Sequence, residues 1–122
     1  MLARRAVAEG RLELPGVVEA RGEDVRTAAQ AGDAGAVAVV DEFARWVALG
    51  LVNLTNLVDP AILVLGGGLA ADADLYEPAI ARWFSALLYS SEIRPAPRLA
   101  FATLGEHAGA IGAALLGAGL AG

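Results

Sequence analysis

The stretch LVNLTNLVDPAILVLGGGLA, residues 51–70, decides how the rest of the chain is interpreted. Its first eight residues continue an apolar helical pattern, and Asp59-Pro60 ends that helix because proline disfavours helical backbone in the residue before it. The unbroken apolar run Ala61–Leu65 then predicts a strand that is covered on both faces. Gly66-Gly67-Gly68 follows the strand directly. A helix, a buried strand and a glycine turn in this order indicate an α/β fold.

Upstream of this stretch the sequence predicts three helices. The first covers Leu2–Glu9, and residues 11–21, which contain a proline and a glycine, form a connecting loop. The second covers Glu23–Gln30 and has acidic residues in its first turn, where the helix dipole favours them. Asp33 caps the third helix, which runs to Val58. The later part of that helix is apolar on most sides, so we expect it to lie against a sheet.

The residues after the glycine turn predict a fourth helix. Asp74 and Glu77 have the spacing of a capping box, with the aspartate at the cap position and the glutamate three residues later. Pro78 then falls in the first turn, where proline is tolerated. Trp83 and Phe84 belong to the apolar stripe of this helix. We assign them, together with Trp46 of the preceding helix, to the core or to a subunit contact.

The C-terminal part predicts a second strand and a last helix. Residues 93–97 hold two prolines and form a connection, after which Arg98–Thr103 alternates well enough for a strand near a sheet edge. The segment from Gly105 onward is rich in small residues and predicts a helix. Because glycine is costly inside a helix, Gly109 and Gly112 indicate close backbone packing against another element.

Composition excludes several classes of protein. The net charge is −5 and the basic residues are scattered, whereas nucleic-acid binding needs clustered positive charge. The chain has no cysteine, no lysine and a single histidine. A Walker-A loop, a protein-kinase site, Schiff-base chemistry and a two-histidine metal motif are therefore excluded. No run approaches the roughly 20 apolar residues of a membrane span, so we expect a cytoplasmic protein without membrane association.

Three segments together resemble one known family. AAQAGD (28–33), the stretch 51–70 and LGEHAGAIGAALL (104–116) resemble the C-terminal portion of ROK proteins (repressors, open reading frames, kinases), and most of all their sugar kinases of the glucokinase type. The resemblance implies an actin-like (ribonuclease H-like) fold of two lobes, in which sugar and ATP meet in the cleft between them. Residues 1–122 would then form a single domain, the C-terminal lobe, with the N-terminal lobe absent.

The resemblance also implies a nucleotide site. In that fold the glycines after the strand belong to the adenosine motif, since a nucleotide lies flat on the backbone only where no Cβ intrudes. Backbone amides of Gly67, Gly68 and Leu69 would donate to ribose or phosphate oxygens, beyond the carboxyl end of the strand where α/β folds bind ligands. Gly66, Gly67, Gly68 and Leu69 are thus the candidate ATP-binding residues. A purely structural turn is the alternative.

Few other side chains are candidates for chemistry. His107 is assigned to packing or capping, with a nucleotide contact as the alternative. Asp72 and Asp74 are conceivable magnesium ligands, but helix capping explains Asp74 more simply. No catalytic residue and no metal ligand is assigned within this chain, and magnesium would accompany ATP in the full-length parent. The resemblance implies that the catalytic base and the sugar-binding residues lie upstream.

The functional hypothesis is the nucleotide-binding part of an ATP-dependent hexose kinase, most simply glucokinase. The parent would transfer the γ-phosphoryl group of ATP to the sugar 6-hydroxyl, with the hexose bound mainly by the missing lobe. The isolated chain is expected to be catalytically silent, and a homo-oligomer is expected. Two alternatives remain: the effector-binding lobe of a ROK transcriptional repressor, and a dimerisation module with a vestigial nucleotide loop.

Overall fold

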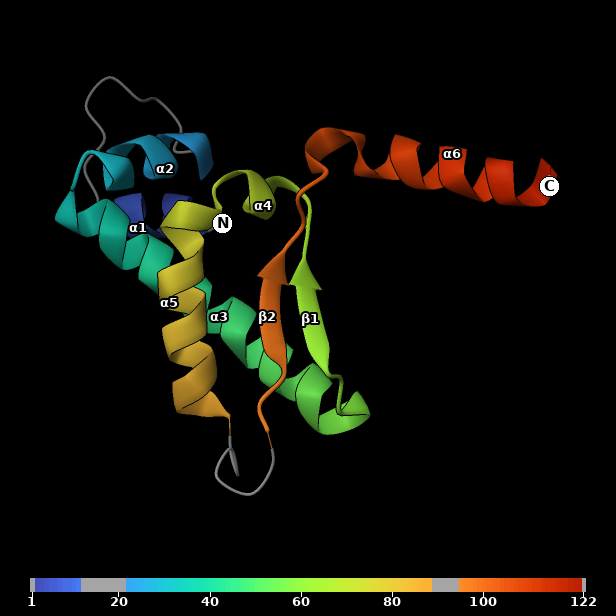
Figure 1. Cartoon of the computed structure of the whole chain (residues 1–122). Helices are drawn as coiled ribbons and strands as arrows, with labels where there is room; N and C mark the ends of the chain where they lie inside the picture. Colours follow the sequence, from blue (N-terminus) through green and yellow to red (C-terminus); the bar gives the residue numbers. More distant parts are fainter. Residues whose placement is uncertain (1, 12–21, 89–94, 122) are drawn as a thin grey trace.

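Two short parallel strands lie side by side and form the sheet of this chain (Figure 1). In the register of β1 (Ile62–Leu65) and β2 (Arg98–Phe101), Ile62 lies opposite Arg98 and Leu65 lies opposite Phe101. Parallel strands need a crossover connection, and α5 (Ala73–Leu87) provides it. The carboxyl ends of both strands therefore lie at the same edge of the sheet.

The structure is a computed structural model that describes residues 2–11, 22–88 and 95–121. Besides α5, its helical elements are α1 (Leu2–Ala8), α2 (Gly22–Gln30), α3 (Ala34–Val58), α4 (Gly68–Ala71), the 3₁₀ turn η1 (Gly105–His107) and α6 (Ala108–Ala121). The predicted connections at 11–21 and 93–97 lie, apart from residues 11 and 95–97, outside the described residues. Within the described ranges, no helix combines the length and hydropathy needed to cross a bilayer.

The longest helix, α3, begins and ends where the sequence predicts. The Asp33 carboxylate accepts a hydrogen bond from the Ala36 amide over 2.8 Å and so satisfies a donor at the helix N-terminus. At the other end Asp59 has a left-handed backbone with φ 46°, and its amide donates to the Thr55 carbonyl over 2.9 Å. Pro60 follows directly and cannot continue the helix.

The core lies between α3, α5 and one face of the strand pair. Ile80 of α5 is fully buried and clusters with Ala44 of α3 and Leu65 of β1. A neighbouring buried cluster joins α3, the end of α5 and both strands through Ala48, Val52, Phe84, Leu88, Leu63 and Leu99. The expectation that the later part of α3 lies against a sheet is confirmed, and Phe84 is a core residue.

A second core holds the N-terminal helices in place. Ala6 of α1 and Val25 and Ala29 of α2 are buried against the first turns of α3. Leu75 and Tyr76, near the start of α5, pack against the same cluster. The N-terminal helices and the beginning of α5 therefore share one apolar contact surface, and this surface fixes α2 relative to α5.

Two packing predictions are wrong. The strand β1 is covered on one face only, because Ile62 and Val64 are 39% and 62% exposed. The last helix makes no close backbone contact, since a Cβ added at Gly109 or Gly112 would meet nothing within 4 Å. Figure 1 shows why: α6 extends away from the sheet, and its main contact is with the adjoining η1.

The predicted start of the fourth helix is also wrong. Helix α5 begins at Ala73, so Asp74 lies within the first turn and is not the cap. The preceding helical turn, α4, leads almost directly into α5, because amides of Leu75 and Tyr76 already donate to the Asp72 carbonyl. Pro78 consequently lies in the helix interior, beyond the first turn.

Candidate nucleotide-binding site

The glycine turn lies directly after β1 and leads into α4 (Figure 1). Gly66, Gly67 and Gly68 are all exposed. Gly67 adopts φ 72° and ψ −155°, a conformation that residues with a side chain rarely reach. The turn itself therefore requires glycine at position 67.

The other two glycines are not required by the fold. Neither Gly66 nor Gly68 has a positive φ. A Cβ at Gly66 would meet only the Ala102 Cβ, at an ordinary 3.8 Å, and a Cβ at Gly68 would meet nothing within 4 Å. Glycine at a helix start without a conformational reason costs backbone entropy. The result is a bare main-chain surface at residues 66–68, which we call the glycine ledge.

Leu69 anchors the ledge. Its side chain is partly buried against the cluster of Ala44, Leu65 and Ile80. The Ala70 amide donates to the Gly67 carbonyl over 3.1 Å and closes the turn. The first amides of a helix have no partner within the helix. Because α4 is only one turn long, we expect its first backbone amides, rather than a helix dipole, to interact with a ligand on the ledge.

A second turn lies beside the ledge. The Ala102 amide donates to the Leu65 carbonyl over 2.7 Å, and η1, which follows, contacts α4. Gly105 opens η1 with φ 61°. His107 is exposed there, so of the packing or capping role predicted for it, packing is wrong. The proximity of this turn to the ledge was not predicted from the sequence, although a glycine turn after each of two parallel strands is a signal that could have indicated it.

Asp72 lies at the far end of α4, and its carboxylate is engaged in an ion pair. Arg26 Nη1 donates to Asp72 Oδ2 over 3.1 Å. Burial raises the pKa of the nearby Tyr76 hydroxyl, the Asp72 charge raises it further, and the Arg26 charge opposes them. Asp74 is exposed. The described residues hold no group of three or more potential ligands for a metal ion.

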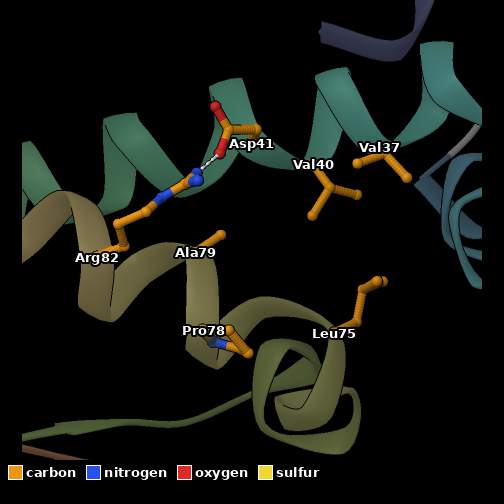
Figure 2. A pocket seen from close by; sticks show the side chains of 7 residues that line it. All are labelled: Val37, Val40, Asp41, Leu75, Pro78, Ala79 and Arg82. Carbon is orange, nitrogen blue, oxygen red and sulfur yellow. Dashed lines mark hydrogen bonds and ion pairs between the residues drawn. The ribbon is translucent and has the colours of Figure 1, made fainter.

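A groove of about 480 Å³ lies between α3 and α5 (Figure 2). Its lining is mostly apolar and consists of Val37, Val40, Asp41, Leu75, Pro78, Ala79 and Arg82. Arg82 forms an ion pair with Asp41, which also accepts a hydrogen bond from Trp83 Nε1 over 3.1 Å. The two charged groups of the groove thus neutralise each other. None of the lining residues belongs to the glycine ledge.

The aromatic residues divide between core and surface. Phe84 is 3% exposed, whereas Trp46 is 54% exposed and lies outside the core. Arg45 lies over both Trp46 and Trp83, with its Cζ 5.9 Å and 5.7 Å from the ring centroids. Of the two roles predicted for Trp46, the core role is wrong.

Comparison with known proteins agrees with this fold. The chain matches the ROK family over residues 9–119. It is 37% identical to a glucokinase of Streptomyces coelicolor over 93 residues, which is 76% of this chain and 29% of that enzyme. It is also 37% identical to an N-acetyl-D-glucosamine kinase of Aliivibrio salmonicida over 98 residues, 80% of this chain and 32% of that enzyme.

Solved structures give the same result. A ROK family glucokinase from Streptomyces griseus, in complex with glucose and AMPPNP, superposes with a TM-score of 0.81 at 34% identity, over 94% of this chain and 39% of that one. A ROK hexokinase from Thermus thermophilus superposes with a TM-score of 0.72 at 34% identity, over 93% of this chain and 37% of the other. These neighbours have the actin-like ATPase fold, which confirms the predicted fold class.

The chain spans about a third of the length of the curated relatives described above. Its match to the family nonetheless covers most of its own residues, from just after α1 through almost all of α6. The chain belongs to the ROK family.

Proposed function

We propose that this chain is the nucleotide-binding part, the C-terminal lobe, of an ATP-dependent sugar kinase, and that the glycine ledge receives the adenosine side of ATP. The observation that carries the proposal is the absence of side chains at Gly66 and Gly68, for which the fold gives no reason. A ligand that lies flat on the main chain would explain why both positions lack a side chain. A structural neighbour that contains AMPPNP supports ATP as that ligand.

The residues of the ledge would act by positioning. Gly67 and Gly68 allow close approach to the backbone, and the amides of Gly68 and Leu69 donate to oxygens of the ribose or the phosphates. The Leu69 side chain holds the turn against the core. Phosphoryl transfer depends largely on such positioning and on neutralisation of charge. This chain would contribute the positioning of the nucleotide.

Magnesium would enter with the nucleotide. Proteins commonly bind Mg²⁺ through one or two carboxylates together with substrate phosphates. The described part of the chain holds no group of three or more potential metal ligands, and the Asp72 carboxylate is paired with Arg26. We therefore assign no metal ligand here. The catalytic base and the sugar-binding residues would come from the rest of the full-length kinase.

The proposed reaction of the parent is transfer of the γ-phosphoryl group of ATP to the 6-hydroxyl of a hexose in the cytoplasm. Glucose is our first choice of substrate, since glucokinases are among the relatives at 37% identity. N-acetyl-D-glucosamine is the second, because kinases for that sugar are relatives at similar identity. The isolated chain is expected to be catalytically silent and to bind ATP weakly.

Titration with a fluorescent ATP analogue tests the ledge. Gly68→Val is the informative variant, because its side chain would enter open space in a backbone conformation open to valine. We expect it to abolish binding while leaving the thermal unfolding midpoint unchanged. Gly67→Val should also abolish binding, but valine at this positive φ would strain the backbone of the turn. Gly32→Val, at φ 88° in the turn before α3, reproduces that strain away from the ledge and serves as the matched control.

Three outcomes separate the hypotheses. Loss of binding in both ledge variants with retention in Gly32→Val supports a nucleotide site. Binding that Gly68→Val leaves unchanged would mean that the glycines form an ordinary turn, as expected of a dimerisation module with a vestigial loop. A wild-type chain that binds a free sugar but no nucleotide would favour the effector-binding lobe of a repressor.

A further inference from the structure

One ion pair joins α2 to the chain segment that carries the glycine ledge. Arg26 of α2 and Asp72 are 46 residues apart in sequence, and Arg26 Nη1 lies 3.1 Å from Asp72 Oδ2. The Asp72 side chain is only 20% exposed and that of Arg26 is 38% exposed. Since α2 is fixed by the buried Val25 and Ala29, the guanidinium extends from an anchored helix.

Asp72 is the residue at which α4 ends and α5 begins. Its backbone leaves the helical conformation, with φ −116° and ψ 35°. Its amide donates to the Leu69 carbonyl over 3.3 Å, and its own carbonyl accepts from the amides of Leu75 and Tyr76. A helix cap would use the Asp72 carboxylate for the first amides of α5, but no such bond forms. The carboxylate instead binds the Arg26 guanidinium.

The ledge is thus held at two ends. Near its start, the Leu65 carbonyl accepts from the Ala102 amide, which joins the end of β1 to β2. Beyond its end, the one-turn helix α4 leads to Asp72. A single turn has too few internal hydrogen bonds to keep its own orientation. The direction of the amides at Gly68 and Leu69 therefore depends on how Asp72 is held.

We propose that Arg26 and Asp72 are positioning residues for the nucleotide: their ion pair fixes the junction of α4 and α5, and thereby the direction of the ledge amides. This inference rests on the proposed function of the ledge. A partly exposed ion pair contributes little to global stability. Its effect should therefore be seen in nucleotide affinity and local amide exchange rather than in the unfolding midpoint.

The test compares four variants of the 122-residue chain in titrations with the fluorescent ATP analogue. Arg26→Met and Asp72→Asn each remove one charge with little change of shape. The double variant Arg26→Asp with Asp72→Arg restores the pair with reversed signs. Arg82→Met is the matched control, because it breaks another pair between helices, the one with Asp41, which joins α5 to α3 and does not involve the junction of α4 and α5. Exchange at the amides of Ala70 and Asp72 is measured in parallel.

We expect each single variant to weaken binding about three- to tenfold and to speed exchange at Ala70 and Asp72, since small misplacements of binding groups have large effects. The double variant should recover most of both losses, and Arg82→Met should change neither. Unchanged affinity in Arg26→Met, with binding abolished by Gly68→Val, would overturn the positioning role and leave the proposed function intact. If the wild type binds no analogue, the proposed function fails; unchanged exchange rates in Arg26→Met would then overturn the positioning role as well.

Discussion

The Leu65 carbonyl accepts a hydrogen bond from the Ala102 amide over 2.7 Å, one residue beyond the paired ends of the two strands. This bond places the glycine turn after β1 beside the turn after β2. Parallel pairing alone creates that arrangement, because it brings both carboxyl ends to one edge of the sheet. The turn that begins at Gly66 and the turn that contains η1 therefore lie together at the sheet edge where α/β folds bind ligands.

The core of α3, α5 and β1 should dominate stability. Ile80→Ala removes a fully buried side chain and is expected to lower the free energy of unfolding by about 2–5 kcal/mol. Leu116→Ala changes a side chain that is 68% exposed on α6 and should alter it by less than about 0.5 kcal/mol. Urea unfolding followed by circular dichroism measures both. Similar losses in the two variants would mean that α6 packs on the body in solution.

The N-terminus of α3 should depend on its cap. Asp33→Ala removes the acceptor for the Ala36 amide and is expected to cost about 0.5–2 kcal/mol. Asp33→Asn keeps an acceptor oxygen and should cost much less. The two unfolding curves measured side by side test the assignment, and an equal loss in both would show that charge rather than capping matters at this position.

Tyr76 should ionise above its ordinary range. Burial raises the pKa of its hydroxyl, the Asp72 charge adds to this, and the Arg26 charge opposes it. Tyrosine at an ordinary pKa titrates near pH ~10, so the unfolded chain ionises first. The contribution of Tyr76 to stability is thus complete below that pH and is lost as the pH rises through the folded pKa.

Absorbance titration of the Tyr89→Phe variant isolates Tyr76, since the chain has two tyrosines. The midpoint should lie above that of free tyrosine. Adding Arg26→Met should raise it further, because the opposing positive charge is lost. A midpoint at or below the ordinary value would contradict the environment described for Tyr76.

Trp46 should contribute to self-association. A tryptophan that is 54% exposed, with Arg45 over its ring, has the composition of an interface hot spot. We expect Trp46→Ala to weaken the homo-oligomer by tenfold or more in sedimentation equilibrium, at unchanged unfolding midpoint. Val64→Ala, on the exposed face of β1, is the control for general loss of surface hydrophobicity. A monomeric wild-type chain would contradict the predicted homo-oligomer.

Elements with local signals could be predicted from sequence. The cap at Asp33, the stop at Asp59-Pro60 and the apolar run before Gly66 depend on neighbours in the chain, and the structure confirms α3 and β1 within a residue. The resemblance of three segments to ROK proteins was enough to predict the family. The spacing of Asp74 and Glu77 misled about where the fourth helix begins, because α4 starts the helical hydrogen bonding earlier.

Features that depend on distant residues could not be predicted in this way. Nothing in the sequence near Arg26 indicates a partner 46 residues away. The exposure of Val64 depends on what covers the sheet, and that of Leu116 on where α6 extends. For the candidate site, the resemblance indicated Gly66–Leu69. The proximity of the Gly105 turn required the strand register, which short apolar runs do not specify.

The central claim is that nucleotide lies on the glycine ledge, and amide chemical shifts during titration of the chain with AMPPNP test it most directly. We predict that the backbone amides of Gly67, Gly68 and Leu69 shift together and saturate at one common concentration, while Val37 and Arg82 of the α3–α5 groove stay unchanged. Largest shifts in that groove, or no shift at residues 66–69 while other amides saturate, would contradict the claim.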